Sequence, residues 1–314
     1  MTLYYKYSDY LKNKFNTKVY KLPVNIPVTC PNRDGTISFG GCSYCGEEAA
    51  GFECLSNTIP VAEQLNKNMC YIKEKYNAEK FIAYFQNFTN TFMPLNDFKN
   101  YINEANLPYI ADISISTRPD CVNSSYLDFL KEYKEKTKIN ITIELGLQTS
   151  NYHTLEKINR GHTLAEYIFS ANQIKRYGFD LCTHVILNLP WDTRLDTIET
   201  AKILSAVSST HAKLHALYIP KKSKIAKQFL NNELKLLSIE EYIDRVILFL
   251  EYLSPDISIQ RIIGRAPKEN TLFVNWNTSW WKIKEMIENK MTELNTWQGK
   301  NFNYLNGTIL KKYQ

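Results

Sequence analysis

The 314-residue chain lacks the features that would place it in a membrane or outside the cell. Its first ten residues contain no long apolar stretch of the kind found in signal peptides. Nowhere is there a run of about 18 uncharged apolar residues, the length that a membrane helix needs. Seven cysteines are too few for a disulfide-stabilised scaffold of this size, and three of them are clustered. We therefore expect a cytoplasmic protein whose clustered cysteines bind metal in a reducing compartment.

Two further absences narrow the choice of fold and site. No Gly-x-Gly-x-x-Gly sequence follows the first predicted strand, which weakens a dinucleotide-binding interpretation. No histidine occurs in the first 150 residues, so a metal site there must rely on other ligands. Hydrophobic residues make up 44% of the chain, which is enough for one large core.

The strongest chemical signal is a group of three cysteines, Cys30, Cys42 and Cys45, spaced C-x11-C-x2-C. One proline and three glycines lie between them, which predicts an irregular loop in which three thiolates can converge. Three cysteines suit a [4Fe–4S] cluster that keeps one iron open to another ligand. Structural zinc usually takes four protein ligands, and the nearest candidate for a fourth is Cys54. The spacing therefore favours the cluster over zinc.

Apolar extended segments alternate with amphipathic helical segments along the chain. Strands are predicted over residues 18–29, 80–88, 111–117, 140–149, 181–189, 213–219 and 257–263. Helices are predicted over residues 59–76, 95–105, 124–135, 164–177, 193–207, 239–253 and 280–291. About six β-α units in succession indicate an α/β fold, a partial or full (β/α) barrel with a parallel sheet. We expect the barrel over residues 1–253 and a C-terminal extension packed on it over 254–314, with the chemistry at the C-terminal strand ends.

Several predicted strands carry polar residues that share one face. These residues are Ser114, Ser116 and Arg118; Glu144 and Gln148, with Gly146 between them on the same face; His184 and Asn188; and His215. Burying such a group costs about 1–3 kcal/mol unless it finds a hydrogen-bond partner. A single one of them is readily explained as a satisfied core residue. Four strands with polar groups on one face favour a polar ligand in the barrel lumen.

The positive charge is concentrated in the last third of the chain. Residues 211–314 carry 16 Lys and Arg against 10 Asp and Glu, whereas residues 1–210 carry 22 of each sign. A basic region can attract the phosphates of RNA, although an ordinary solvated lysine surface explains the excess equally well. Lys221, Lys222, Lys224 and Lys227 follow the sixth strand and are predicted to lie at the catalytic rim of the barrel.

A three-cysteine loop after the first strand of a (β/α) barrel resembles the radical S-adenosylmethionine (SAM) superfamily. The usual spacing there is C-x3-C-x2-C, and the longer first gap resembles the branch with the Elongator-type tRNA acetyltransferases. The same branch includes a bacterial family that this chain resembles closely along most of its length, and a Gram-positive member of it looks like the enzyme that converts carboxymethylaminomethyl-uridine to aminomethyl-uridine at the tRNA wobble position. The resemblance rests on residues 30–35, 40–45, 84–91, 116–120, 144–149, 158–162, 188–190 and 214–217.

This resemblance implies a radical SAM enzyme that uses a [4Fe–4S] cluster and SAM to generate a 5′-deoxyadenosyl radical. The cluster ligands would be the three cysteines of the loop. Gln148 and His184 lie where barrel residues contact the ribose and adenine of SAM, and Arg160 could pair with the methionine carboxylate. Glu144 and Arg118 are candidate contacts for SAM or substrate. No catalytic residue is assigned.

The implied partners are tRNA and an electron donor such as flavodoxin or ferredoxin, with no role for a membrane or DNA. Two other functions stay open: a radical SAM enzyme acting on a small molecule or peptide, and a zinc-stabilised RNA-binding protein without catalysis. The chain also departs from the family pattern in two places. The common Gly-Gly-Glu that receives the methionine amine is replaced by a sequence beginning at Gln86, and Arg265 stands where an acidic residue is expected.

Overall fold

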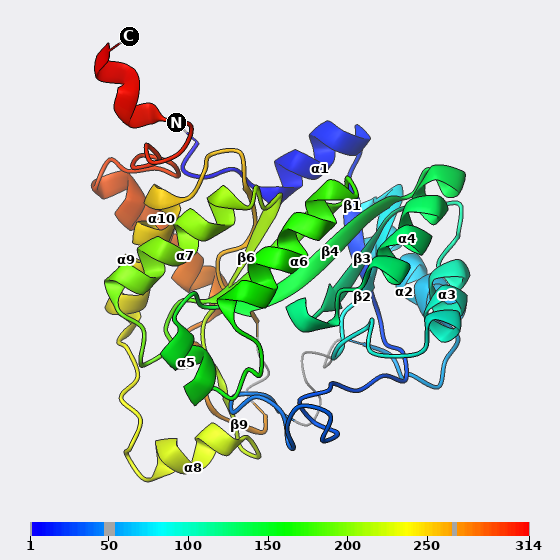
Figure 1. Cartoon of the computed structure of the whole chain (residues 1–314), viewed down its shortest axis with the longest axis horizontal. Coiled ribbons are helices and arrows are strands. Elements are labelled where there is room, and N and C mark those ends of the chain that lie inside the picture. The colour runs from blue at the N-terminus through cyan, green and yellow to red at the C-terminus, as the bar shows by residue number, and fades with distance from the viewer. Residues whose placement is uncertain (1, 47–53, 266–268, 314) are drawn as a thin grey trace.

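The centre of the protein is a seven-stranded parallel sheet that curves into an open half-barrel. The computed structural model describes residues 2–46, 54–265 and 269–313. The strands are β1 (Val19–Val24), β2 (Lys80–Phe85), β3 (Ile110–Thr117), β4 (Asn140–Gln148), β5 (Asp180–Ile186), β6 (His211–His215) and β8 (Ser258–Arg261). They are hydrogen-bonded in this order, and every neighbouring pair is parallel (Figure 1). The predicted α/β partial barrel is confirmed.

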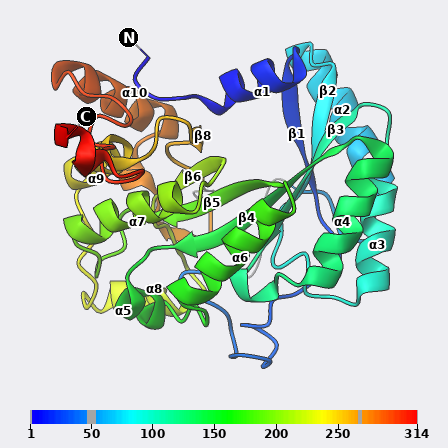
Figure 2. The same ribbon diagram turned by 45° about the horizontal axis from the view of Figure 1, so that its top comes forward.

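Helices between successive strands cover the outer face of the sheet (Figures 1 and 2). They are α2 (Val61–Tyr76), α3 (Leu95–Glu104), α4 (Ser124–Thr137), α6 (Leu164–Arg176), α7 (Arg194–Ala206) and α9 (Ile239–Tyr252), and a further helix, α10 (Trp280–Glu293), follows the last strand and packs against α9. Three of them, α6, α7 and α9, begin at capping boxes, with Thr163, Thr193 and Ser238 as the N-cap residues. In a capping box the N-cap hydroxyl accepts a hydrogen bond from a backbone N–H of the first turn, and an acidic side chain of that turn accepts one from the N-cap backbone N–H. None of the helices described by the structure is long and apolar enough to cross a membrane.

Shorter elements complete the chain. They are α1 (Tyr7–Phe15), α5 (Tyr152–Lys157), α8 (Lys224–Leu230), the antiparallel pair β7 (Ile219–Pro220) and β9 (Thr271–Phe273), and single 3-10 turns over Pro119–Cys121, Asn275–Asn277 and Thr308–Tyr313. The predicted strand over 213–219 is wrong at its end, because β6 stops at His215 and Ile219 pairs in the small second sheet. β8 lies beyond residue 253, in the segment predicted as an extension, and its pairing with β6 places it in the main sheet.

The two faces of β4 illustrate how the sheet divides apolar from polar side chains. Ile143, Leu145 and Leu147 are no more than 2% exposed and belong to the main apolar core. Glu144, between two of them in sequence, faces the lumen, because successive strand residues point to opposite sides. The alternation predicted for this strand is confirmed, and it places polar groups inside the barrel.

α1 covers the N-terminal ends of the strands, at the opposite end of the barrel from the cysteine loop (Figure 1). The Tyr10 hydroxyl donates to Asp180 at the start of β5 over 2.9 Å. Its ring meets the edge of His211, at the start of β6, with centroids 4.5 Å apart. Just before α1, the carbonyl of Tyr5 accepts a 2.7 Å hydrogen bond from the backbone of Ile259 in β8. The N-terminal segment thus joins strands that are far from it in sequence.

Candidate active site

The cysteine loop follows β1 at the C-terminal end of the sheet, as the sequence predicted. Cys42 is buried, whereas Cys30 and Cys45 are half-buried, and all three thiols are free. They line one cavity of about 220 Å³, together with residues from β2, β3, β4, β5 and β6. Three thiols that converge on a cavity at this end of a barrel provide a suitable donor set for an iron–sulfur cluster.

A short segment after α5 holds the cysteine loop in place. The side-chain amide of Asn159 donates to the carbonyl of Gly41 over 3.0 Å, and the backbone amide of Ser43 donates to Ile158 over 2.9 Å. Asn32 in turn donates to the carbonyl of Asn159 over 2.5 Å. The sequence Ile-Asn-Arg-Gly-His at 158–162, one of the family motifs, therefore has a structural role. It fixes the loop that carries the thiols.

Cations and amides face the thiols. Arg160 Nη1 and Asn32 Nδ2 each lie 3.5 Å from Cys42 Sγ, and Arg33 Nη2 lies 3.4 Å from Cys45 Sγ. Burial raises the pKa of the Cys42 thiol, but Arg160 with smaller help from other groups outweighs it, so the pKa is lowered. For Cys45 burial outweighs Arg33, and the pKa is raised. The buried positive charge beside Cys42 suits the thiolates that bind an iron–sulfur cluster, so the residues present fit this group.

Two of the predicted cofactor contacts, Arg160 and Arg118, are held by protein groups. Arg160 donates through Nη2 and Nε to the carbonyl of Gly146, over 2.7 and 3.3 Å. Arg118 forms a two-pronged ion pair with Asp120, over 2.8 and 2.6 Å, and donates to the carbonyl of Arg160 over 2.8 Å. Both arginines line the cavity and stabilise the end of β4 and the segment after α5. Their contact with a ligand stays a prediction.

The end of β4 has an irregular backbone where it meets the cavity. The register with β5 shifts between Gly146 and Gln148, and Gln148 has a φ of 78°. Positive φ is unusual for a residue with a side chain, and such strain is typical of functional positions. A Cβ atom at Gly146 would lie 2.7 Å from both Arg160 Nη2 and Gln148 Nε2, so these two side-chain ends would have to shift if Gly146 were replaced. Gln148 and His184 line the same cavity, as the sequence predicted, and their contact with SAM stays a prediction.

Glu144 is the centre of a buried polar network in the lumen. Its carboxylate accepts hydrogen bonds from Lys21, Ser114 (2.9 Å), His184 (2.7 Å), Lys213 (3.0 Å) and Gln260 (3.2 Å). Burial raises the pKa of Glu144, but Lys21, Lys213 and His184 outweigh it and hold the pKa well below its usual value. Burial and the charge of Lys213 lower the pKa of His184 to about 4, so this imidazole is neutral near pH 7. Its Nε2–H then donates to Glu144.

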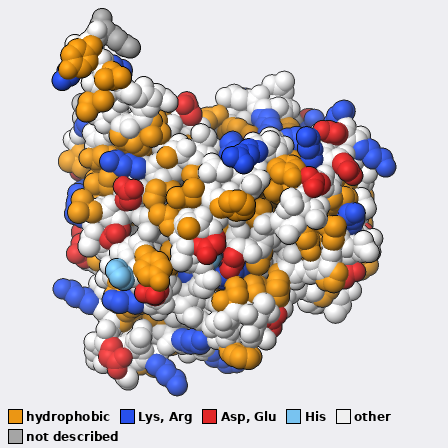
Figure 3. Space-filling model, viewed as in Figure 1, with side chains coloured by type: hydrophobic (Ala, Val, Ile, Leu, Met, Phe, Trp, Pro, Cys, Tyr) orange, Lys and Arg blue, Asp and Glu red, His pale blue; other side chains and the backbone are white. Residues whose placement is uncertain are grey.

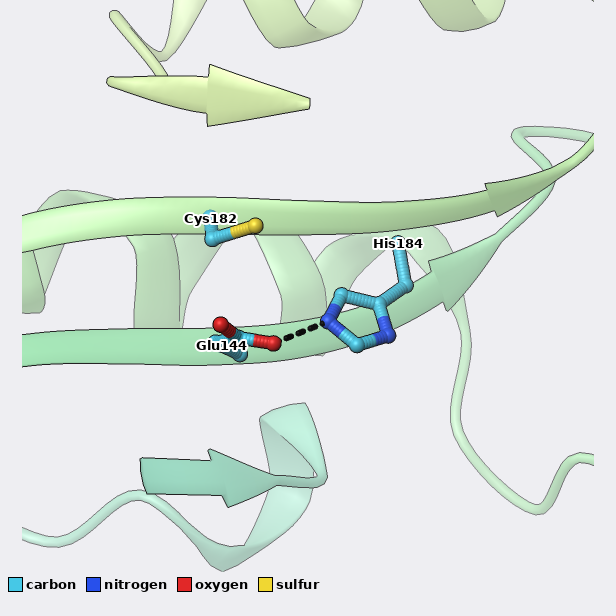
Figure 4. A group of neighbouring side chains, drawn as sticks. All are labelled: Glu144, Cys182 and His184. Carbon is cyan, nitrogen blue, oxygen red and sulfur yellow. Dashed lines mark hydrogen bonds and ion pairs between the residues drawn. The ribbon is translucent and has the colours of Figure 1, made fainter. Parts of the chain in front are cut away.

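Glu144, Cys182 and His184 together resemble a metal site by donor type, since their ligand atoms lie within 4.8 Å of one another (Figure 4). Two observations argue against metal binding here. The ammonium groups of Lys21 and Lys213 are bound to the carboxylate, and burial, with Glu144 nearby, raises the pKa of the Cys182 thiol. A metal needs the thiolate. The three residues therefore belong to the polar network.

A second hollow, a cleft of about 960 Å³, lies between β1 and β8 and extends to α1 and α10. Its lining contains six lysines and one arginine but only one aspartate: Lys6, Lys12, Lys18, Lys21, Lys213, Lys284, Arg261 and Asp9. Tyr84, Gln86, Lys213 and Arg261 line both hollows, so the basic cleft adjoins the cysteine cavity. Gln86 begins the segment that replaces Gly-Gly-Glu.

The sequence reasoning missed Tyr84, Lys213 and Arg261. One signal was present for Lys213, which stands between the apolar Ala212 and Leu214 in a strand and so points to the opposite, inner face. Arg261 ends a four-residue strand and carries no comparable pattern. Arg265, which replaces the expected acidic residue, is exposed.

The chain matches the model of the radical SAM superfamily over residues 24–204 and that of the radical SAM C-terminal domain over residues 210–293. The protein therefore belongs to the radical SAM superfamily, and it is an enzyme of the class that uses a [4Fe–4S] cluster and SAM. It is 32% identical over 303 residues to the uncharacterised protein YtqA of Bacillus subtilis, covering 96% of this chain and 94% of that protein.

Two more distant similarities extend the comparison. The Elp3 structure from Methanocaldococcus infernus aligns with a TM-score of 0.68 at 15% identity, covering 89% of this chain and 64% of that chain. This likeness concerns the fold. The tRNA-2-methylthio-N(6)-dimethylallyladenosine synthase of Thermosipho melanesiensis is 26% identical over 148 residues, which is 46% of this chain and 32% of that protein.

Proposed function

We propose that this enzyme modifies the wobble uridine of tRNA, converting its carboxymethylaminomethyl group to aminomethyl. The proposal is supported by the sequence motifs described above and by the partial similarity to a tRNA-modifying synthase. The cluster and SAM, held by the residues named below, would supply the hydrogen-abstracting chemistry of a 5′-deoxyadenosyl radical. The protein provides ligands, positions the substrate and excludes water.

Particular residues of this chain would carry out these tasks. Cys30, Cys42 and Cys45 would hold the cluster, with positive charge from Arg160 beside the buried thiolate. Gln148 and His184 would contact the nucleoside part of SAM from the ends of β4 and β5. In this arrangement, a substrate enters from the basic cleft and meets the cofactor at the residues shared by the two hollows.

The observation that carries the choice of tRNA is the basic cleft beside the cysteine cavity. Four of its lysines, Lys6, Lys12, Lys18 and Lys21, come from the first 21 residues rather than from the basic C-terminal third. Lysines spaced along a cleft attract the phosphates of a polyanion and release its counterions. A nucleotide that leaves the anticodon loop could pass through the cleft to the cofactor.

The lysines predicted to contact RNA, on and before α8, occupy a separate surface. Lys221, Lys222 and Lys227 are exposed beside the cysteine loop, and Figure 3 shows Lys and Arg side chains around α8 at the lower left. Lys224 donates to the carbonyl of Phe39 within the loop over 2.7 Å, so its removal would disturb the cysteines. A test of this surface should therefore leave Lys224 unchanged.

Mass spectrometry of tRNA nucleosides from cells with and without the gene tests the substrate. Without the gene, carboxymethylaminomethyl-uridine should accumulate and the aminomethyl form should disappear. The wild-type gene should restore the normal pattern, and a Cys42→Ala version should fail to do so. Unchanged wobble nucleosides, together with SAM cleavage in the presence of another small molecule or peptide, would favour that other substrate.

Salt dependence of tRNA binding tests the surface. A Lys12→Ala/Lys18→Ala variant should flatten the slope of log affinity against log salt by roughly 2, because each phosphate contact contributes about 0.9 to the slope. A Lys221→Ala/Lys227→Ala variant removes the same charge beside α8 and is the matched control. If only the second variant changes the slope, RNA binds near α8 and the cleft has another role.

A further inference from the structure

Aromatic side chains lie among the lysines of the basic cleft. Five of them line it: Tyr4, Tyr7, Tyr20, Tyr84 and Trp280. A positively charged groove with interleaved aromatic rings is typical of sites for single-stranded nucleic acid, because the cations contact phosphates while the rings stack on bases. A base needs a ring with an open face, so the surroundings of each ring decide which one can accept it.

Four of the five rings are already engaged within the protein. Tyr4 and Tyr84 are buried, at 5% and 6% exposed. Tyr20 stacks on Tyr76, with ring centroids 4.9 Å apart, and Tyr7 contacts two further rings of the chain. These four side chains therefore build the wall of the cleft.

Trp280, the first residue of α10, differs from the other four. It is 44% exposed, and in the part of the chain that the structure describes its ring has no stacking or cation partner. Lys284, one turn further along the same face of α10, also lines the cleft. The contact of Lys284 with Glu288, at 3.6 Å, is a weak surface ion pair. An open aromatic face and a cation thus lie next to each other.

This part of the cleft lies away from the cysteine cavity. α10 runs beside the N-terminal segment, where the Tyr4 hydroxyl donates to Glu288 over 2.7 Å (Figure 2). Trp280 and Lys284 line the cleft alone, whereas Tyr84 lines both hollows. A nucleotide that reacts must reach the cysteine cavity, so a base at Trp280 would belong to a neighbouring nucleotide of the same strand.

We infer that Trp280 is the stacking platform for an RNA base next to the nucleotide that is modified, with Lys284 beside it for the adjoining phosphate. This inference rests on the proposed function, because it takes the substrate to be an unpaired loop of tRNA. Bases of such loops can be splayed apart and stacked on aromatic side chains. Stacking of the flanking base would hold the loop open while the target nucleotide enters the lumen. Every base has an aromatic face, so this contact contributes affinity and accepts any base.

Binding of an anticodon stem-loop RNA at several salt concentrations tests the stacking without requiring turnover. The protein is the full chain with its cluster and SAM. Trp280→Ala should weaken binding about five- to hundredfold, the usual effect of losing one contact between a base and an aromatic ring, and Trp280→Phe should keep part of the affinity. The slope of log affinity against log salt should stay unchanged in Trp280→Ala, because no phosphate contact is lost. Lys284→Ala should instead flatten it by roughly 1.

A matched control and a second set of probes make the result specific. Trp281 is 58% exposed and lies outside the lining of the cleft, so Trp281→Ala should bind the RNA as tightly as the wild type. Stem-loops that lack one base at each loop position in turn locate the stacked base. At one position beside the wobble nucleotide, loss of the base and Trp280→Ala should have no additive effect, because both remove the same contact. Cluster absorbance should persist in both tryptophan variants, which shows that they are folded.

Three outcomes would overturn the inference. The first is a wild-type protein that does not bind the stem-loop. The second is a Trp280→Ala protein that binds it no more weakly than Trp281→Ala does. The third is additivity of Trp280→Ala with base loss at every loop position, which would make Trp280 a structural residue. The proposed function fails separately: if base loss and Trp280→Ala are coupled but the wobble uridine stays unconverted, the stacking site stands and the proposed reaction falls.

Discussion

The two ends of the cavity use positive charge in different ways. At the cysteine end, Arg160 and Arg33 face thiols while each also donates to a backbone carbonyl, of Gly146 and Gly46 respectively. At the junction with the cleft, ammonium groups converge on one side chain, Glu144. The first arrangement fixes cations through the backbone beside a resident group. The second pairs ammonium groups with a buried carboxylate side chain inside the lumen.

The largest expected effect is at the cysteine end. Alanine at Cys30, Cys42 or Cys45 should each abolish the cluster, which in its complete form holds about four irons, because two thiolates do not retain it. Iron content and absorbance near 400 nm after anaerobic reconstitution measure the loss. Cys54→Ala is the matched control and should retain full iron. A Cys30→Ala protein with full iron and normal SAM cleavage would refute the assignment.

A substitution at Glu144, where the cavity meets the cleft, should instead lower the free energy of unfolding. Glu144→Gln leaves the buried Lys213 and the half-buried Lys21 without their counter-charge, and breaking a buried ion pair typically costs about 3–5 kcal/mol. Urea unfolding of the cluster-free protein measures the change. Adding Lys213→Met to Glu144→Gln should recover part of the loss, because one stranded charge is removed. A Glu144→Gln protein as stable as the wild type would show that the network contributes little.

The pH dependence of stability should reflect the buried imidazoles. Burial lowers the pKa of four histidines, His162 and His211 to about 3, His184 to about 4 and His215 well below its usual value. Burial raises the pKa of two carboxyl groups, Asp112 and Asp192, to about 6. Near pH 6 the unfolded chain therefore binds about two more protons than the folded protein, and stability rises with pH there.

The consequence is a loss of stability on acidification, which begins as the pH falls through about 6.5. Two protons correspond to about 2–3 kcal/mol per pH unit around pH 6. Urea unfolding of the cluster-free protein at pH 7 and at pH 5.5 checks this value. His184→Asn at the junction and His162→Asn at the cysteine end should each reduce the slope by about one proton. Stability that increases toward pH 5.5 would contradict the assignment of neutral histidines.

The smallest expected effect is that of replacing Gly161 or Gly178 by alanine. Comparing these two variants separates the cost of backbone strain from the effect of a contact with the cysteine loop. Gly161 and Gly178 have φ values of 76° and 71°, so alanine at either should cost about 1–2 kcal/mol. A Cβ atom at Gly161 would also lie 2.9 Å from Asn32 Oδ1, whereas one at Gly178 meets nothing within 4 Å. Gly161→Ala should therefore lower iron content, and Gly178→Ala should keep it. Equal iron content in the two variants would show that the loop adjusts.

Local sequence patterns predicted the elements of this fold, because each strand and helix has its own hydrophobic periodicity and its own capping or turn residues at its ends. The polar face of β4 followed from alternation, and the converging cysteines followed from their loop. The sequence could not reveal that Lys21 and Lys213 share the carboxylate of Glu144, because that contact depends on the curvature of the whole sheet. Nor could it place the basic cleft, since lysines from residues 6–21 meet β8 and α10 only in three dimensions.

The hydrogen bonds between residues 4–5 and residues 288–298 have a consequence for folding during biosynthesis. The Tyr4 hydroxyl donates to Glu288, and the backbone amide of Tyr5 donates to Gln298, across separations of 284 and 293 residues. Tyr4 and Tyr5 can therefore dock only after residues 288–298 have been synthesised, and closing so long a loop is slow. Tyr4 and Lys6 also line the basic cleft. A nascent chain that already contains the three cysteines therefore still lacks a complete basic cleft until α10 has been synthesised.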